Sequence, residues 1–326
     1  MAHCTRRRAA SGGALRCAGL LLAALLPALL PLPAAAAPRV VVTVKPLHAL
    51  VAGVMAGIGE PELIIRGAGS PHSYTLKPSD ARLLEGAQVV FRVGEPLDAF
   101  LTKPLAALGE RARVVEAMRA PGVALLPGRA GGAWEPHEGH AGAAADGHGH
   151  GHAEAALDGH LWLDPANARA IVLMAADVLG QEDPGNQARY AGNAGRLVAR
   201  IDALDAELRE TLAPVRGVPY VVFHDAYQYF ESRYGLRAVG SVAVSPERTA
   251  GARRVREIRE RIRRLEARCV FSEPQFPSAL LGALVEGTGA RVGTLDPLGA
   301  ALPAGPEAWF TLMRSLGASL AACLGR

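Results

Sequence analysis

The segment NQARYAGNAGRLVARIDALDAELRETL, residues 186–212, decides the expected fold of this 326-residue chain. Pro184 and Gly185 precede the segment and Pro214 follows it, which predicts one helix over 186–213. At 1.5 Å per residue the helix spans about 40 Å. That length and its mid-chain position favour a connection between two lobes, and an ordinary surface helix within one domain is the alternative. Its apolar residues recur every three or four positions and form one stripe, made of Tyr190, Ala194, Leu197, Ile201, Leu204, Leu208 and Leu212.

Short β-branched runs alternate with helical patterns on both sides of this helix. Such alternation predicts α/β lobes with parallel sheets flanked by helices. We expect an N-terminal lobe over 38–185 and a C-terminal lobe over 214–326. The predicted strands are Arg39–Val44, Glu62–Ile65, Gln88–Val93, Pro219–Phe223, Arg268–Ser272 and Arg291–Leu295.

The first 37 residues read as a secretory signal peptide. A basic start (TRRR, 5–8) precedes an apolar run over 18–32 and a small-residue stretch at 34–37, which is the pattern of a cleaved signal. A membrane anchor is the alternative, but two prolines interrupt the apolar run. We therefore expect an exported, soluble protein.

The positive charge of the chain belongs to this leader. The sequence has 35 Lys and Arg against 31 Asp and Glu, and four of the arginines lie before residue 37. The remaining body has 31 basic and 31 acidic residues, so its net charge is zero. A neutral body argues against a nucleic-acid-binding protein.

Two of the four cysteines, Cys4 and Cys17, leave with the signal, and Cys269 and Cys323 remain. Two cysteines in an exported protein most often form one disulfide. Two free buried thiols are the alternative.

Residues 131–156 form a histidine-rich, low-complexity segment. Their 26 residues include seven Gly, eight Ala and four acids. They hold too little apolar surface to offset the entropy of ordering, so we expect a disordered loop. Histidine-rich tracts commonly bind metal, which predicts metal capture here rather than a plain solvated spacer. The five histidines are His137, His140, His148, His150 and His152.

Three other histidines lie where a ligand site is expected. His72 follows the strand at 62–65, His224 directly follows the strand at 219–223, and His160 lies where the histidine-rich loop rejoins the fold. Open α/β sheets bind ligands at the carboxyl ends of their strands. Together the three favour a metal site in a cleft between the lobes, although each taken alone is more often structural. His48 is expected to be a surface or helix-start residue.

Several motifs occur in an order that resembles a known family. The motifs surround the histidine-rich insert and precede a late cysteine, and the likeness runs from about Arg39 to Leu324. In this order they resemble the periplasmic zinc-binding proteins of bacterial ABC zinc importers, the ZnuA family. The motifs are HSYTLKPSD (72–80), HLWL (160–163), VFHDAYQYF (222–230), CVFSEPQF (269–276) and GTLDPLG (293–299).

The resemblance implies a fold and a set of ligands. It implies the metal-specific periplasmic binding protein fold, with two lobes joined by one long helix and Zn²⁺ between them. The ligands fall on His72, His160 and His224, and the family's disulfide falls on Cys269–Cys323. Asp296 matches a metal ligand of some relatives.

The fourth ligand is less clear from the resemblance. Some zinc-binding members carry a glutamate directly before the first histidine, where this chain has Pro71. We favour Asp296 as the fourth ligand, with water as the alternative. Glu273 is a candidate to contact a ligand rather than the metal.

The resemblance also implies a role in transport. A monomeric, non-enzymatic protein would capture Zn²⁺ in the periplasm and deliver it to an inner-membrane ABC permease with its ATPase. Three imidazoles and one oxygen donor suit zinc better than manganese, and manganese-binding relatives place a carboxylate where this chain has His224. The alternatives are a periplasmic zinc buffer or adhesin, and a metalloenzyme in which three histidines leave one coordination position open.

Overall fold

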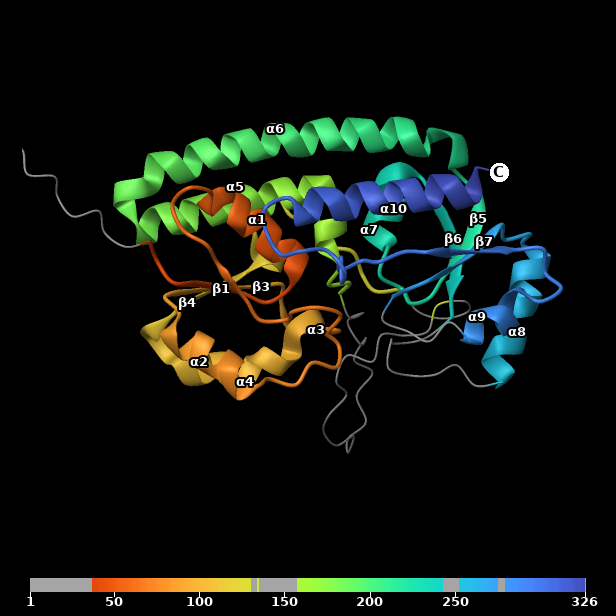
Figure 1. The fold of residues 1–326 in the computed structure, drawn as a ribbon, viewed down its shortest axis with the longest axis horizontal. Coiled ribbons are helices and arrows are strands. Elements are labelled where there is room, and N and C mark those ends of the chain that lie inside the picture. Colours follow the sequence, from red (N-terminus) through yellow and green to blue (C-terminus); the bar gives the residue numbers. More distant parts are fainter. Residues whose placement is uncertain (1–36, 130–133, 135–156, 243–251, 275–278, 326) are drawn as a thin grey trace, which may run out of the picture. The chain divides into compact units, whose positions relative to one another are not determined.

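A computed structural model of the chain describes residues 37–129, 134, 157–242, 252–274 and 279–325. The expected signal peptide, up to residue 36, and all five histidines of the 131–156 segment lie outside the described residues. Residues 37–326 form one compact unit that contains two four-stranded parallel sheets (Figure 1). The expected α/β architecture is therefore confirmed, whereas lobe boundaries at 185 and 214 stay a prediction.

The first sheet has the strand order β2-β1-β3-β4. It contains β1 (Val40–Val42), β2 (Glu62–Leu63), β3 (Val89–Arg92) and β4 (Arg113–Glu116). All residues of β1 and β3 are buried, which explains their valine-rich runs, because a parallel sheet covered on both faces has no solvent side. The connecting helices are α1 (Lys45–Met55), α2 (Pro78–Gly86), α3 (Glu95–Asp98) and α4 (Thr102–Leu108).

The second sheet repeats this topology in the order β6-β5-β7-β8. It contains β5 (Pro219–Val222), β6 (Arg237–Ser241), β7 (Cys269–Ser272) and β8 (Arg291–Thr294). Its helices are α7 (Gln228–Tyr234), α8 (Ala252–Arg264) and α9 (Ala279–Val285). In each sheet the first strand pairs with the second on one side and with the third on the other. Ligands of open α/β sheets bind at the carboxyl edge beside such a reversal.

The sequence prediction missed two strands, β4 and β6. Both are edge strands of their sheets, and their sequences, RVVE and RAVGS, carry charged residues and a glycine. Edge strands need less burial, so they lack the apolar run that reveals the central strands.

The predicted long helix is confirmed as α6 (Gln187–Leu212), and all seven residues of its apolar stripe are buried. It packs against α1, α5 (Pro165–Glu182) and α10 (Ala308–Leu324). In Figure 1 it runs along both α5 and α10. Two glycines permit close approach, because a Cβ on Gly53 of α1 would lie 2.8 Å from Leu197 and one on Gly317 of α10 would lie 2.6 Å from Leu208. The helix thus contacts elements attached to both sheets.

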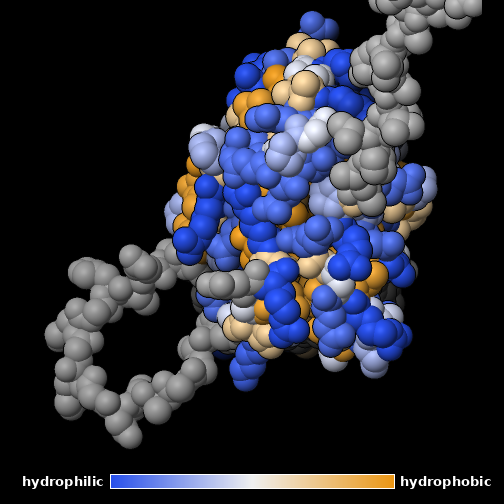
Figure 2. Space-filling view, turned by 90° about the vertical axis from the view of Figure 1, so that its left-hand side faces the viewer, coloured by the Kyte–Doolittle hydropathy of each residue, from blue (hydrophilic) through white to orange (hydrophobic). Residues whose placement is uncertain are grey.

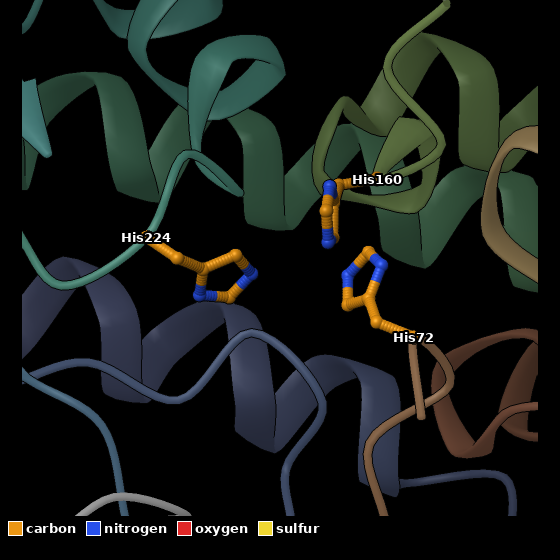
Figure 3. Close-up of side chains that lie close together, drawn as sticks. All are labelled: His72, His160 and His224. Atoms are coloured by element: carbon orange, nitrogen blue, oxygen red, sulfur yellow. The ribbon is translucent and has the colours of Figure 1, made fainter. Parts of the chain in front are cut away.

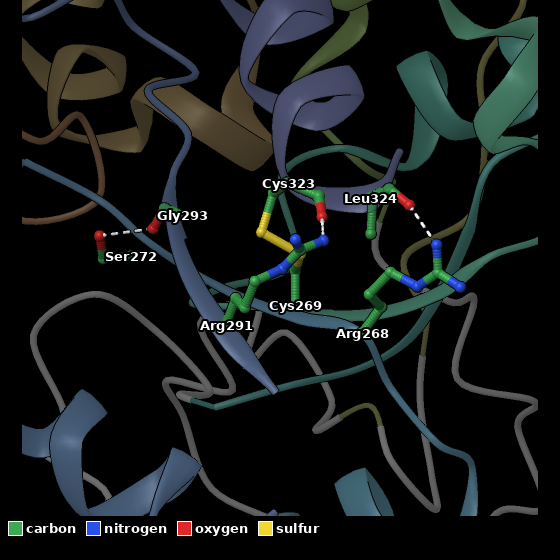
Figure 4. The surroundings of a disulfide bond; sticks show 7 residues. All are labelled: Arg268, Cys269, Ser272, Arg291, Gly293, Cys323 and Leu324. Atoms are coloured by element: carbon green, nitrogen blue, oxygen red, sulfur yellow. Dashed lines mark hydrogen bonds between the residues drawn. A yellow bond between two sulfur atoms is a disulfide. The ribbon is translucent and has the colours of Figure 1, made fainter. Parts of the chain in front are cut away.

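The Cys269–Cys323 disulfide is also confirmed, and it joins β7 to α10 (Figure 4). Arg268 donates to the carbonyl of Leu324 at 2.7 Å, and Arg291 donates to the carbonyl of Cys323. Cations are favourable at a helix C-terminus, where carbonyls lack partners within the helix. The second sheet therefore holds the end of α10 by a covalent bond and two arginines.

Hydrophilic residues dominate the side of the protein shown in Figure 2, and the hydrophobic residues there lie in small separate groups. Among the described residues, none of the helices is both long and apolar enough to span a membrane. Leu173 is the most exposed large hydrophobic residue described, at 53%.

Candidate metal site

The three histidines that the sequence singled out come together in the structure. Each of His72, His160 and His224 offers a ligand atom, and these atoms lie within 4.8 Å of one another. The ring centroids are 5.4 to 5.8 Å apart, and the rings converge on one point from three different segments (Figure 3). Within the part of the chain that the structure describes, this is the one group of three or more metal-ligating side chains at that spacing.

His72 is the most exposed of the three and lies in the turn after β2. Its backbone N–H donates to the Ser70 hydroxyl at 3.3 Å. The following residues are anchored by Tyr74, whose hydroxyl donates to Asp80 at 2.9 Å, and Asp80 also accepts the backbone N–H of Lys77 at the start of α2. The turn that presents His72 is therefore fixed by the N-terminus of the next helix.

His160 is buried, with 2% of its surface exposed, directly before the short helix η4 (Leu161–Leu163). Asp158 accepts hydrogen bonds from its ring nitrogen Nδ1 at 2.8 Å and from its backbone N–H at 2.9 Å. The Trp162 ring packs against the imidazole edge to face, with centroids 5.4 Å apart. These contacts hold the ring in one orientation.

His224 is buried at the carboxyl end of β5, and Glu273 at the end of β7 orients it. Glu273 accepts a hydrogen bond from His224 Nδ1 at 2.6 Å. Burial lowers the pKa of His224, but the nearby carboxylates, Glu273 above all, outweigh this effect and raise the pKa above its ordinary value.

The two carboxylates set the chemistry of the two buried histidines. A carboxylate at Nδ1 keeps the proton there and leaves the lone pair on Nε2, the arrangement found at protein metal sites. The sequence reasoning named Glu273 as such a contact and missed Asp158. The spacing Asp-Gly-His over 158–160 was the available signal, but it is too common to mark a metal site.

Asp296 is placed differently from the histidines. Its carboxylate accepts the backbone N–H groups of Leu298, Gly299 and Ala300 at 2.6 to 3.1 Å, so it caps the turn after β8. It does not belong to the 4.8 Å group found among the described residues. Asp296 as a fourth ligand stays a prediction.

His48 lies in the first turn of α1, as expected for a helix-start residue, but it is buried, with 6% of its surface exposed. Its Nε2 lies 2.9 Å from the carbonyl oxygen of Pro61, and burial lowers its pKa. The alternative expectation of a surface position was therefore wrong, because α1 packs under both β2 and α6.

The structure has two parallel sheets with identical topology, a long helix that contacts both halves, and a cluster of three histidines. Together these features define a class, the metal-binding α/β proteins. The family model described as "Zinc-uptake complex component A periplasmic" matches residues 40–323. The chain belongs to this family, ZnuA.

Individual relatives agree with this assignment. The high-affinity zinc uptake system protein ZnuA of Brucella suis is 45% identical over 306 residues, which cover 88% of this chain and 92% of that protein. Among solved structures, the periplasmic zinc-binding protein TroA of Treponema pallidum has a TM-score of 0.74 at 22% identity, with 89% and 99% of the chains covered. The laminin-binding protein of Streptococcus agalactiae, described as having adhesin and metal-transporting activity, has a TM-score of 0.72 at 24% identity, with 88% and 99% covered. At these identities the two structures show the fold alone.

Proposed function

We propose that this protein captures Zn²⁺ in the periplasm with His72, His160 and His224 and delivers it to an inner-membrane ABC permease with its ATPase. The observation that carries the proposal is the three-histidine cluster, in which buried carboxylates orient two of the rings. The zinc-uptake names of the family and of the Brucella suis relative support the same cargo.

The donor set suits zinc. Imidazole is a preferred zinc ligand, and a tetrahedral zinc about 2.0 Å from each nitrogen holds the nitrogens about 3.3 Å apart. The ligand atoms of the three histidines, which all lie within 4.8 Å of one another, are close to this spacing. We expect Asp296 or a water molecule to complete the four ligands. With Asp296, the carboxylate would share its oxygens between zinc and the turn it caps.

Calorimetric titration of the mature protein with Zn²⁺, with Mn²⁺ and Cu²⁺ as competitors, tests this proposal. We expect one tight zinc site that each of the variants His72→Ala, His160→Ala and His224→Ala weakens by orders of magnitude, because only water can take the place of the lost imidazole. His48→Ala is the matched control, since His48 is buried, as His160 and His224 are, but lies outside the cluster. Unchanged affinity in all three cluster variants would rule out the site.

The delivery step needs a separate test. Zinc uptake by cells that lack this protein should be restored by the wild type and not by the three cluster variants. Restoration by a cluster variant that binds no zinc in solution would contradict the proposal.

A further inference from the structure

The partly buried arginine Arg129 connects the first half of the chain to the segment that carries His224. Its Nε lies 3.0 Å from both carboxylate oxygens of Asp225, and its Nη2 donates to the same carboxylate. Its Nη1 donates to Glu231 at 2.6 Å. The side chains of Asp225 and Glu231 are 4% and 6% exposed, and that of Arg129 is 20% exposed. Asp225 directly follows His224, so Arg129 binds the turn that carries this histidine.

Arg129 itself stands on a segment that is tied to His160. Pro127 and Leu157 form an antiparallel bridge, and the N–H of Asp158 donates to the carbonyl of Leu126 at 2.9 Å. Asp158 in turn accepts the hydrogen bond from His160 Nδ1. Residues 126–127 and 157–158 therefore form one paired unit, which we call the paired segment. This unit orients His160, and Arg129 follows it by two residues.

A second contact joins the paired segment to the part of the chain that follows His224. The Tyr229 hydroxyl, from α7, accepts the N–H of Leu126 and donates to the carbonyl of Asp158, both at 3.0 Å. The Trp134 ring covers the outer face of the Arg129 guanidinium, whose central carbon lies 3.5 Å from the ring centroid. Partial exclusion of water strengthens the ion pairs beneath it.

We propose that Arg129 is a positioning residue of the metal site: it holds the His224 turn against the paired segment and so sets the separation of His160 and His224. The inference rests on the proposed zinc site. Arginine suits this task because its planar fork binds a carboxylate through two nitrogens while a third nitrogen reaches a second acid. The ion pairs use none of the proposed metal ligands, so they can orient two of the three rings independently of the metal.

A substitution at Arg129 distinguishes a positioning role from a purely electrostatic one, because the two roles change zinc affinity in opposite directions. Removal of a positive charge near the site would by itself strengthen the attraction for Zn²⁺. Loss of positioning has the opposite sign, because the histidines must then be ordered when zinc binds. We expect Arg129→Met to weaken zinc binding about 10- to 100-fold, as for other residues that orient metal ligands without contacting the metal. We expect Arg129→Lys, which restores a charge but not the two-nitrogen contact, to recover part of the loss.

The matched control is Arg92→Met. Arg92 of β3 forms a more deeply buried ion pair, 2.7 Å long, with Asp98 of α3 rather than with the turn that carries His224. Its loss should lower the thermal midpoint and leave zinc affinity unchanged.

The experiment measures Zn²⁺ affinity by chelator competition and the visible spectrum of bound Co²⁺, which reports ligand geometry, in wild type and in these variants. Weaker zinc binding and an altered Co²⁺ spectrum in Arg129→Met, but not in Arg92→Met, support the proposal. Zinc binding as tight as or tighter than wild type, with an unchanged spectrum, overturns it. If Arg129→Met does not fold, the Co²⁺ spectrum of Arg129→Lys decides in the same way. Failure of the zinc site itself would appear separately, as a wild type that binds no tighter than His224→Ala.

Discussion

The variant Glu273→Gln tests how much of the zinc affinity comes from the carboxylate behind His224. Glutamine keeps the size of the side chain and an acceptor oxygen, so the change removes mainly the charge. The hydrogen bond is 2.6 Å long and Glu273 is 3% exposed, which makes it a charge-assisted bond with little competition from water.

The magnitude follows from this setting. A hydrogen bond to a charged group contributes about 1.5–3 kcal/mol. Partners that orient metal-binding histidines change affinity about 10- to 100-fold, which corresponds to about 1.4–2.8 kcal/mol. The two ranges overlap, so we expect zinc affinity to fall about 10- to 100-fold.

The same variant should shift the titration of His224 in the zinc-free protein. Glu273 is the main group that raises this pKa against the effect of burial. Without the charge, burial has the larger influence, so the pKa of His224 should fall. Chelator competition near neutral pH measures the affinity, and a two-dimensional NMR titration of the imidazoles measures the pKa.

A matched control separates this effect from general loss of stability. Asp205 of α6 binds Arg233 of α7 at 2.5 Å, so Asp205→Asn should reduce stability at unchanged zinc affinity. Unchanged zinc affinity in Glu273→Gln would refute the reasoning, because the charge behind His224 would then contribute nothing to the metal.

Three further predictions address proton competition, the disulfide and the histidine-rich segment. The pKa of His224 is raised, so this histidine keeps its proton to a higher pH than an ordinary histidine does. Because the proton competes with zinc, zinc affinity should fall steadily as the pH is lowered from about 8 to about 5.5. Chelator competition across this range measures the affinity, and an affinity that does not change with pH would contradict the ligand set. The Cys269→Ser/Cys323→Ser variant should lose about 4 kcal/mol of unfolding free energy in the chain-entropy model, since the bond closes a loop with a sequence separation of 54. Urea unfolding checks this, and equal stability would show that α10 is held without the bond. Deletion of residues 135–156, which keeps Arg129 and Trp134, should lower the number of zinc ions bound and retain one tight site in calorimetry. Loss of the tight site would refute the separation of the two roles.

The elements that depend on local pattern could be predicted from the sequence. The stripe of α6 was predicted residue by residue, because burial of one helix face imposes a period that any single sequence displays. The four central strands were found because parallel strands there are buried on both faces, and two of the four edge strands, β2 and β8, were found as well. The disulfide could be predicted because an exported protein with two remaining cysteines most often joins them. The three histidines could be predicted from their places near strand ends and in the family motifs.

The sequence offered Glu273 as a candidate contact, but the folded structure showed which histidine Glu273 orients and added Asp158 and Arg129. Glu273 lies 49 residues from His224, and Arg129 lies 96 residues from Asp225. No periodicity links such positions, since the contacts exist only once the sheets and the paired segment are packed. The structure likewise shows Asp296 capping its own turn, which the motif alone does not reveal. An amphipathic pattern can be recognised in the sequence because it is local. A buried carboxylate, in contrast, is stable only with partners that the folded chain brings to it from distant positions.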